Sequence, residues 1–224
     1  DPAFELKPDS FAAVQELCYR LDGLPLAIEL VAARVRLMSP QHLLDRLIVD
    51  GRLQLGLVVD GLRALPERQN NLNSLMAWSY RLLPGPVQAV FRRLSVFNGD
   101  FPLEAAEAVC VLNDGLTLGS VWNALTILVD CHLLEARVGS DQSRFRLLET
   151  VREFASRQLE TSGELDAARR AHLAHFRRWL TDGISRQQTD QAAWLRLLQG
   201  ERANLYAALD VAIATGERQV SADL

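Results

Sequence analysis

Apolar residues recur at the three- to four-residue spacing of amphipathic helices along most of the chain. Polar caps and first-turn prolines favour helix starts at three places in the N-terminal part: Asp9-Ser10, Pro25 and Ser39-Pro40. Gly23 and Gly51 are suited to close the first and third of these helices, and the second is expected to run to about Met38. Residues 1–51 are therefore predicted to form a compact helical bundle.

The helical pattern breaks over residues 52–65, where glycines stand among leucines and valines. Glycine and proline interrupt regular structure, so this stretch is predicted to be a linker with extended portions and the best candidate for a domain boundary.

Residues 66–160 combine helical patterns with two strand-like runs. Helices are expected over residues 65–83, 87–97, 103–109, 120–132 and 150–159, and strands over 133–138 and 144–148. Residues 139–142 are turn formers, which predicts a β-hairpin. In the helix over 87–97, Arg92 and Arg93 are expected on the outward face. Three helices followed by a hairpin is the order of a winged helix.

The remainder, residues 161–224, again has helical spacing, over 164–181, 189–199 and 202–213. No repeat of about 34 residues is visible in it, so an array of helical repeats is not demonstrated. The fold class predicted for the whole chain is mainly α: a helical bundle, a winged helix and a C-terminal helical extension.

Composition and charge limit the kinds of partner that the chain is expected to bind. The chain has 224 residues, 49% of them hydrophobic and 23% charged, as in globular domains. The net charge of −4 gives no overall attraction to nucleic acids or acidic membranes, although a local basic patch remains open. No run is apolar enough to span a bilayer, and no secretory leader opens the chain. A cytoplasmic location and no membrane partner are expected.

Candidate chemistry is sparse. The three cysteines, Cys18, Cys110 and Cys131, are widely spaced and favour neither a disulfide framework nor zinc. His172 and His175 are three residues apart on a helix, which by itself is a weak metal signal. No catalytic set and no metal site are predicted. The tryptophans, Trp122 among them, are interpreted as packing groups.

A family resemblance changes this picture. Cys18-Tyr-Arg-Leu-Asp-Gly-Leu-Pro-Leu-Ala-Ile-Glu-Leu-Val-Ala-Ala-Arg34 resembles the GLPL segment of NB-ARC-type signal-transduction (STAND) ATPases, which include many bacterial transcriptional regulators. Five further segments stand in the order found in LuxR-type and antibiotic-regulator-type members: Leu65–Gln69, Ala77–Tyr80, Phe91–Phe97, Phe145–Ala155 and Trp194–Asn204. The resemblance covers roughly residues 10–214.

The resemblance implies a regulatory fragment with a helical lid subdomain over 1–51, a winged-helix subdomain over 66–160, and the start of a helical, TPR-like sensor arm over 161–224. In that family the motif proline lies against the adenine of ADP or ATP. Adenine contact is thereby implied for Gly23, Leu24, Pro25 and Leu26. Leu148 and Glu149 align with a signature whose histidine touches phosphate. Leu148 departs from that signature, which puts direct phosphate sensing in doubt.

These residues contain no GxxxxGK[ST] phosphate loop. The resemblance therefore implies that ADP or ATP with Mg²⁺ binds a core upstream in a longer parent, and that this fragment alone is not an enzyme and holds no cofactor. The implied partners are that upstream core and downstream helical repeats of the same chain, together with self-oligomerisation. DNA would be bound only through another domain of the parent.

Two alternatives stay open. The first alternative is that the winged helix binds DNA. Asn123 would then contact a base edge, and Arg137, Arg144 and Arg146 would contact phosphates. The predicted recognition helix, residues 120–132, has no Arg or Lys, and this favours packing within the protein over DNA binding. The other alternative is a helical protein-interaction scaffold with no nucleotide role.

Overall fold

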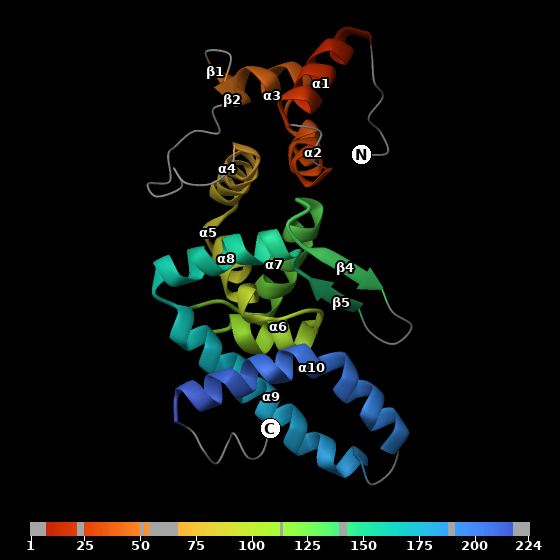
Figure 1. Cartoon of the computed structure of the whole chain (residues 1–224), viewed down its shortest axis with the longest axis vertical. Coiled ribbons are helices and arrows are strands. Elements are labelled where there is room, and N and C mark those ends of the chain that lie inside the picture. The colour runs from red at the N-terminus through yellow and green to blue at the C-terminus, as the bar shows by residue number, and fades with distance from the viewer. Residues whose placement is uncertain are drawn as a thin grey trace. The chain divides into compact units, whose positions relative to one another are not determined.

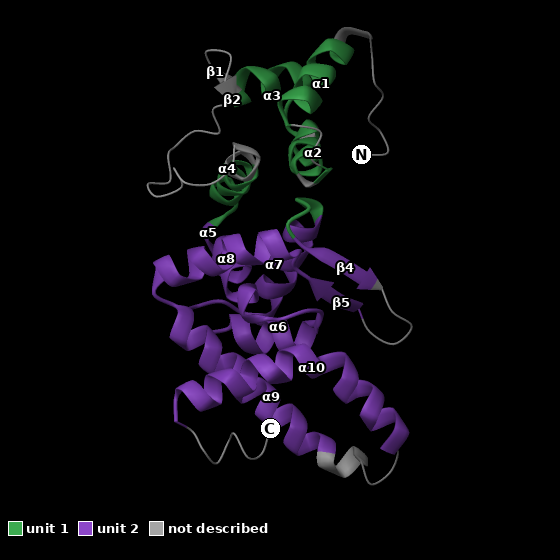
Figure 2. Ribbon diagram, in the orientation of Figure 1, with its two compact units in different colours: residues 1–84, 130–133 green, residues 85–129, 134–224 purple. Residues whose placement is uncertain are grey.

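A computed structural model describes residues 8–21, 25–49, 52–53, 67–112, 114–138, 143–187 and 191–216. The chain divides into two compact units, residues 1–84 with 130–133 and residues 85–129 with 134–224 (Figure 2). Each unit is described by itself. The predicted linker, residues 52–65, lies outside the described residues apart from Arg52 and Leu53.

The first unit is mostly helical (Figure 1). Its elements are α1 (Pro8–Arg20), α2 (Pro25–Ala32), the 3₁₀ helix η1 (Ala33–Arg36), α3 (Pro40–Leu47), the paired strands β1 (Ile48–Val49) and β2 (Arg52–Leu53), and α4 (Glu67–Arg81). Leucines at helical spacing form its core, among them Leu17, Leu30, Leu43 and Leu75. The prediction of helices is thus confirmed for the described residues between 8 and 47, and two short paired strands follow them.

The second predicted helix is shorter than expected. The α-helix ends at Ala32, and the chain tightens into η1, where the Leu37 N–H bonds to the Arg34 carbonyl three residues back. Such 3₁₀ turns are common at helix ends. The third helix has the predicted cap, since the His42 N–H donates to the Ser39 hydroxyl at 3.3 Å.

The second unit opens with a winged helix. Its elements are α5 (Gly85–Arg93), the 3₁₀ helix η2 (Leu94–Val96), β3 (Phe101–Pro102), α6 (Leu103–Cys110), α7 (Leu118–Asp130), β4 (Glu135–Val138), β5 (Ser143–Arg146) and α8 (Glu149–Ser162). The antiparallel sheet has the order β3-β5-β4, with Ala136 and Phe101 both opposite Phe145. The predicted hairpin is confirmed, and its turn, residues 139–142, lies outside the described residues.

Strand β3 was not expected from the pattern, because two residues are too few to show an alternation of period two. Its Phe101 is fully buried and stacks on Phe97, with 4.3 Å between ring centroids. Phe145 tilts toward Phe101 from the neighbouring strand. This aromatic cluster joins the sheet to the helices.

Two long helices follow in the same unit: α9 (Leu165–Gln187) and α10 (Gln191–Ala214). They pack along one another as a hairpin (Figure 1). Trp179 and Trp194 meet with ring centroids 4.9 Å apart, and Trp194 lies directly against Gly183. The prediction of separate helices over 189–199 and 202–213 was wrong. The chain continues through Gly200, because packing of α10 outweighs the roughly 1 kcal/mol that glycine costs inside a helix.

The predicted division into lid, linker, winged helix and arm stays a prediction. In the compact units α4 belongs with α1–α3, and α9 and α10 belong with the winged helix. Among the helices that the structure describes, none has both the length and the apolar character needed to cross a membrane.

Candidate functional site

In a winged helix, helix α7 occupies the position of the recognition helix, and its exposed face is mainly apolar. Trp122 is 53% exposed and Leu118 is 58% exposed. Asn123 and Thr126 are exposed beside them, and the helix contains no Arg or Lys. Trp122 is therefore not buried within the described residues, and its role as a packing group against another surface stays a prediction. This face can bury apolar area against another surface but has no cation for a phosphate.

The three arginines of the wing are all engaged by carboxylates of the same unit. Arg137 Nη1 lies 3.3 Å from Asp100 Oδ2, and Arg146 Nε lies 3.8 Å from Asp100 Oδ1. Arg144 Nη2 donates to Glu201 Oε1 at 2.6 Å and to the Asp100 carbonyl at 2.9 Å. The structure thus brings the three arginines together around Asp100, and much of their positive charge is neutralised there.

Helix α10 supplies the buried half of this cluster. Glu201 and Asn204 are among the few buried polar residues. The Asn204 amide donates to the Asp100 carbonyl at 3.0 Å and to Glu201 at 3.1 Å, and its oxygen accepts the Asn98 N–H at 2.8 Å. We call these residues, Asp100, Arg144, Glu201 and Asn204, the wing–arm cluster. The sequence pattern gave Glu201 and Asn204 no role.

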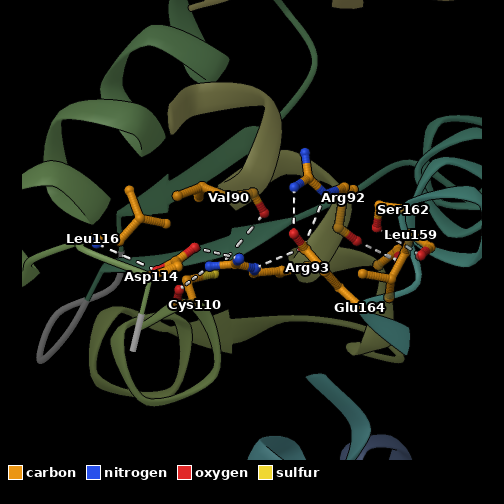
Figure 3. A network of polar contacts seen from close by, with 10 residues as sticks. Val90, Arg92, Arg93, Cys110, Asp114, Leu116, Leu159, Ser162 and Glu164 are labelled. Atoms are coloured by element: carbon orange, nitrogen blue, oxygen red, sulfur yellow. Dashed lines mark hydrogen bonds and ion pairs between the residues drawn. The ribbon is translucent and has the colours of Figure 1, made fainter. Parts of the chain in front are cut away.

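A second polar cluster gathers around Arg92 and Arg93 at the end of α5 (Figure 3). Arg93, expected outward, has a side chain only 2% exposed. It donates to Glu164 at 2.9 Å, to the Cys110 carbonyl at 2.7 Å and to Asp114 at 2.5 Å. Arg92 reaches the same Glu164. The expectation of an outward Arg93 was wrong, because an apolar stripe cannot reveal a distant carboxylate that compensates a buried charge.

This Arg93 cluster sets the protonation of its members. Burial by itself raises the pKa of Glu164, but hydrogen bonds from Arg92 and Arg93 outweigh it and bring that pKa below its ordinary value. The hydrogen bond from Arg93 likewise lowers the pKa of Asp114. Burial raises the pKa of the Cys110 thiol to about 12, so it stays protonated. The cluster joins α5 to Asp114, in the segment before α7, and to Glu164, the residue before α9.

The residues implied for nucleotide contact are only partly described. Pro25 is exposed at the first position of α2, as an adenine contact requires. Gly23, Leu24 and the side chain of Leu26 lie outside the described residues. Leu148 caps the N-terminus of α8 without a side-chain hydrogen bond. Glu149 is exposed and bound by Arg152 at 2.6 Å, which lowers its pKa. Their nucleotide roles stay predictions.

Comparison with known proteins bears on the winged helix directly. Residues 83–160 match the family described as "Winged helix-turn-helix domain". The chain is 46% identical, over 165 residues or 74% of its length, to a Mycobacterium tuberculosis protein named "Putative HTH-type transcriptional regulator Rv0890c", and equally to one named "Putative HTH-type transcriptional regulator Mb0914c" from Mycobacterium bovis. It is 37% identical over 177 residues, 79% of its length, to "Uncharacterized protein Rv0894" of Mycobacterium tuberculosis.

The chain spans 18% of the length of the first two relatives and 43% of the third. The matched family begins close to Gly85, where the second compact unit begins. The described strands and helices of that unit have the order a winged helix requires. Residues 83–160 are thus a winged helix-turn-helix domain, and the chain is homologous to proteins named as HTH-type transcriptional regulators.

Proposed function

We propose that this chain is the winged helix-turn-helix part of a transcription regulator, and that its winged helix acts by packing against protein rather than by reading DNA. The observation that carries the proposal is the surface of α7, where Trp122 and Leu118 are exposed and no cation is present.

Electrostatics supports the packing role. Affinity for DNA comes largely from Lys and Arg that neutralise phosphates and release counterions. Here the wing arginines already lie beside Asp100 and Glu201, so binding phosphate would require breaking those pairs. Burying one exposed tryptophan against protein stabilises a complex by roughly 2–3 kcal/mol, with no charge to desolvate.

We further infer that the packing partner is a nucleotide-binding core in the longer parent protein. Pro25 and its neighbours would meet the adenine of ADP or ATP, with Mg²⁺ and the phosphates held by that core. Exchange of ADP for ATP would then free the winged helix and permit oligomerisation. The resemblance of the GLPL segment supports this switch, as does the exposure of Pro25.

The second candidate is a winged helix that binds DNA itself. The match to the winged helix-turn-helix family and the names of the relatives favour it more than they favour a nucleotide switch. In this reading Asn123 contacts a base edge, and Arg137, Arg144 and Arg146 leave their carboxylates for the DNA backbone.

DNA binding separates the two candidates. Fluorescence anisotropy would be measured with labelled double-stranded DNA at about 50 and about 200 mM salt, where a protein that contacts phosphates changes affinity steeply. The packing role predicts negligible binding at both. Salt-dependent binding that is lost when Arg137 and Arg146 are changed to Gln, but kept in a matched Arg202→Gln control, would establish the second candidate instead.

The packing role has its own test in the longer regulator. Trp122→Gln is expected to change the output of a transcription reporter while leaving the helical circular dichroism of the protein intact. A matched Leu195→Gln variant, on the exposed face of α10, controls for the loss of surface apolar area. Equal reporter output from wild type and the Trp122 variant would remove α7 from the mechanism.

A further inference from the structure

A cavity of about 370 Å³ lies within the second unit, and its lining includes Asn98, whose N–H donates to Asn204 of the wing–arm cluster. It is bounded by η2 and the residues after it, by α8, and by the facing parts of α9 and α10. Its volume is in the range of small-molecule sites in proteins. The winged helix and the helical extension both contribute to its walls.

The charged residues of the wall are arranged unusually. Arg152 is already held by Glu149 at 2.6 Å. Arg169, on α9, and Asp210, on α10, line the same cavity, and neither side chain has an ion pair or hydrogen bond to any residue that the structure describes. They are not paired with one another. A cation and an anion that face one space without meeting are suited to a ligand carrying the opposite charge at each end.

A buried polar atom lies at the same wall. His172 is 1% exposed, and its Nε2 has no hydrogen-bond partner within the described part of the chain. Phe97 and Phe176 pack against its ring. A buried polar atom without a partner destabilises a fold by about 1–3 kcal/mol.

We propose that the cavity binds a small zwitterion of the free amino acid class, with its carboxylate on Arg169 and its ammonium group on Asp210. Ser156 provides a neutral hydrogen-bonding group for the remainder of the ligand. The cavity has both polar and apolar wall, including Leu165 and Val211, so a side chain of modest size fits beside the charges.

Such a ligand would join α8, α9 and α10. Burial lowers the pKa of His172 to about 3, with a smaller effect from His175, so the imidazole at this wall is neutral near pH 7. The site therefore has a single cation and a single anion available to the ligand. It adds a small-molecule input to the chain, independent of whether the winged helix packs on protein or binds DNA.

The test is a thermal-shift measurement on the 224-residue chain with each of the twenty common amino acids, followed by calorimetric titration of any that raises the melting temperature. Acetate and methylammonium serve as single-charge controls. Arg169→Gln and Asp210→Asn are each expected to weaken binding at least tenfold. Arg170→Gln and Asp182→Asn, exposed residues that do not line this cavity, are matched controls and should bind as wild type does.

Three results would overturn the proposal. The class of ligand is wrong if no amino acid raises the melting temperature, or if acetate alone reproduces the effect and Asp210→Asn leaves it unchanged. The site is wrong if binding survives in both cavity variants. Because Arg169 and Asp210 are exposed, both variants should keep the melting temperature of the unliganded wild type, which is measured first.

Discussion

Replacing Glu164 by Gln tests whether the Arg93 cluster stabilises the second unit. Glu164 accepts hydrogen bonds from both Arg92 and Arg93, and it is the main counter-charge of the buried Arg93 (Figure 3). Glutamine has nearly the same shape but no charge, so the change removes the electrostatic contribution and leaves the packing. Arg93 then retains only Asp114, whose side chain is 35% exposed, as a charged partner.

The magnitude follows from these burials. A hydrogen bond to a charged group contributes about 1.5–3 kcal/mol, and the one from Arg93 is shielded from water. The two hydrogen bonds from Arg92 contribute less to stability, because the Arg92 side chain is 16% exposed and water can replace them. Breaking a buried ion pair costs about 3–5 kcal/mol when one charge is left without compensation. With Asp114 still present, Glu164→Gln is expected to lower the free energy of unfolding by about 2–4 kcal/mol.

Urea unfolding followed by tryptophan fluorescence measures this loss. A Trp78→Phe background confines the signal to the tryptophans of the second unit, Trp122, Trp179 and Trp194. Asp166→Asn, two residues along and exposed, is the matched control and should change the free energy by less than about 0.5 kcal/mol. If Glu164→Gln costs no more than this control, the Arg93 cluster does not hold the domain together and the argument fails.

Three further outcomes are expected. Gly183→Ala should cost about 1–3 kcal/mol in chemical denaturation, since a Cβ there would overlap the Trp194 ring. Asn204→Ala should cost a similar amount and speed amide hydrogen exchange at Asn98, whose N–H loses its acceptor. With its pKa lowered in the fold to about 3 from 6.5, His172 stays neutral while the unfolded chain takes up a proton. Stability should therefore fall by about 1.4 kcal/mol per pH unit below about pH 6.5, and His172→Phe should abolish that part of the pH dependence in denaturation titrations.

Periodicity predicted the helices and the hairpin because these elements bury one face and keep the other in water. It succeeded most clearly for the winged helix, where Val121, Leu125 and Leu128 of α7 are all buried. It failed where an element is too short to show a period, or where tertiary packing determines how far a helix extends. Strand β3 is too short to have a period, and α10 passes through Gly200 because Trp194 and Ala208 on either side are buried.

The polar clusters were beyond the reach of sequence patterns. Arg93 pairs with Glu164, 71 residues away, and Arg144 pairs with Glu201, 57 residues away. No local spacing links such residues, and a charged residue next to an apolar stripe is ordinarily exposed. One signal was available, since Arg93 occupies a core-facing turn beside Phe91 and Leu94 in a motif quoted for the resemblance. A charge in such a position indicates a buried partner elsewhere.

The wing–arm cluster also determines how a change in the helical extension would reach the winged helix. Glu201 and Asn204 are three residues apart on α10. Asn204 donates to the Asp100 carbonyl and to Glu201, and Glu201 accepts from Arg144. Asp100 in turn holds Arg137 and Arg146 of the wing. A displacement of α10 therefore cannot leave the wing arginines as they are, because moving Glu201 removes the counter-charge of Arg144. Loss of that contact would leave Arg144 without its buried counter-charge, so the position of α10 and the charge of the wing are coupled through Glu201.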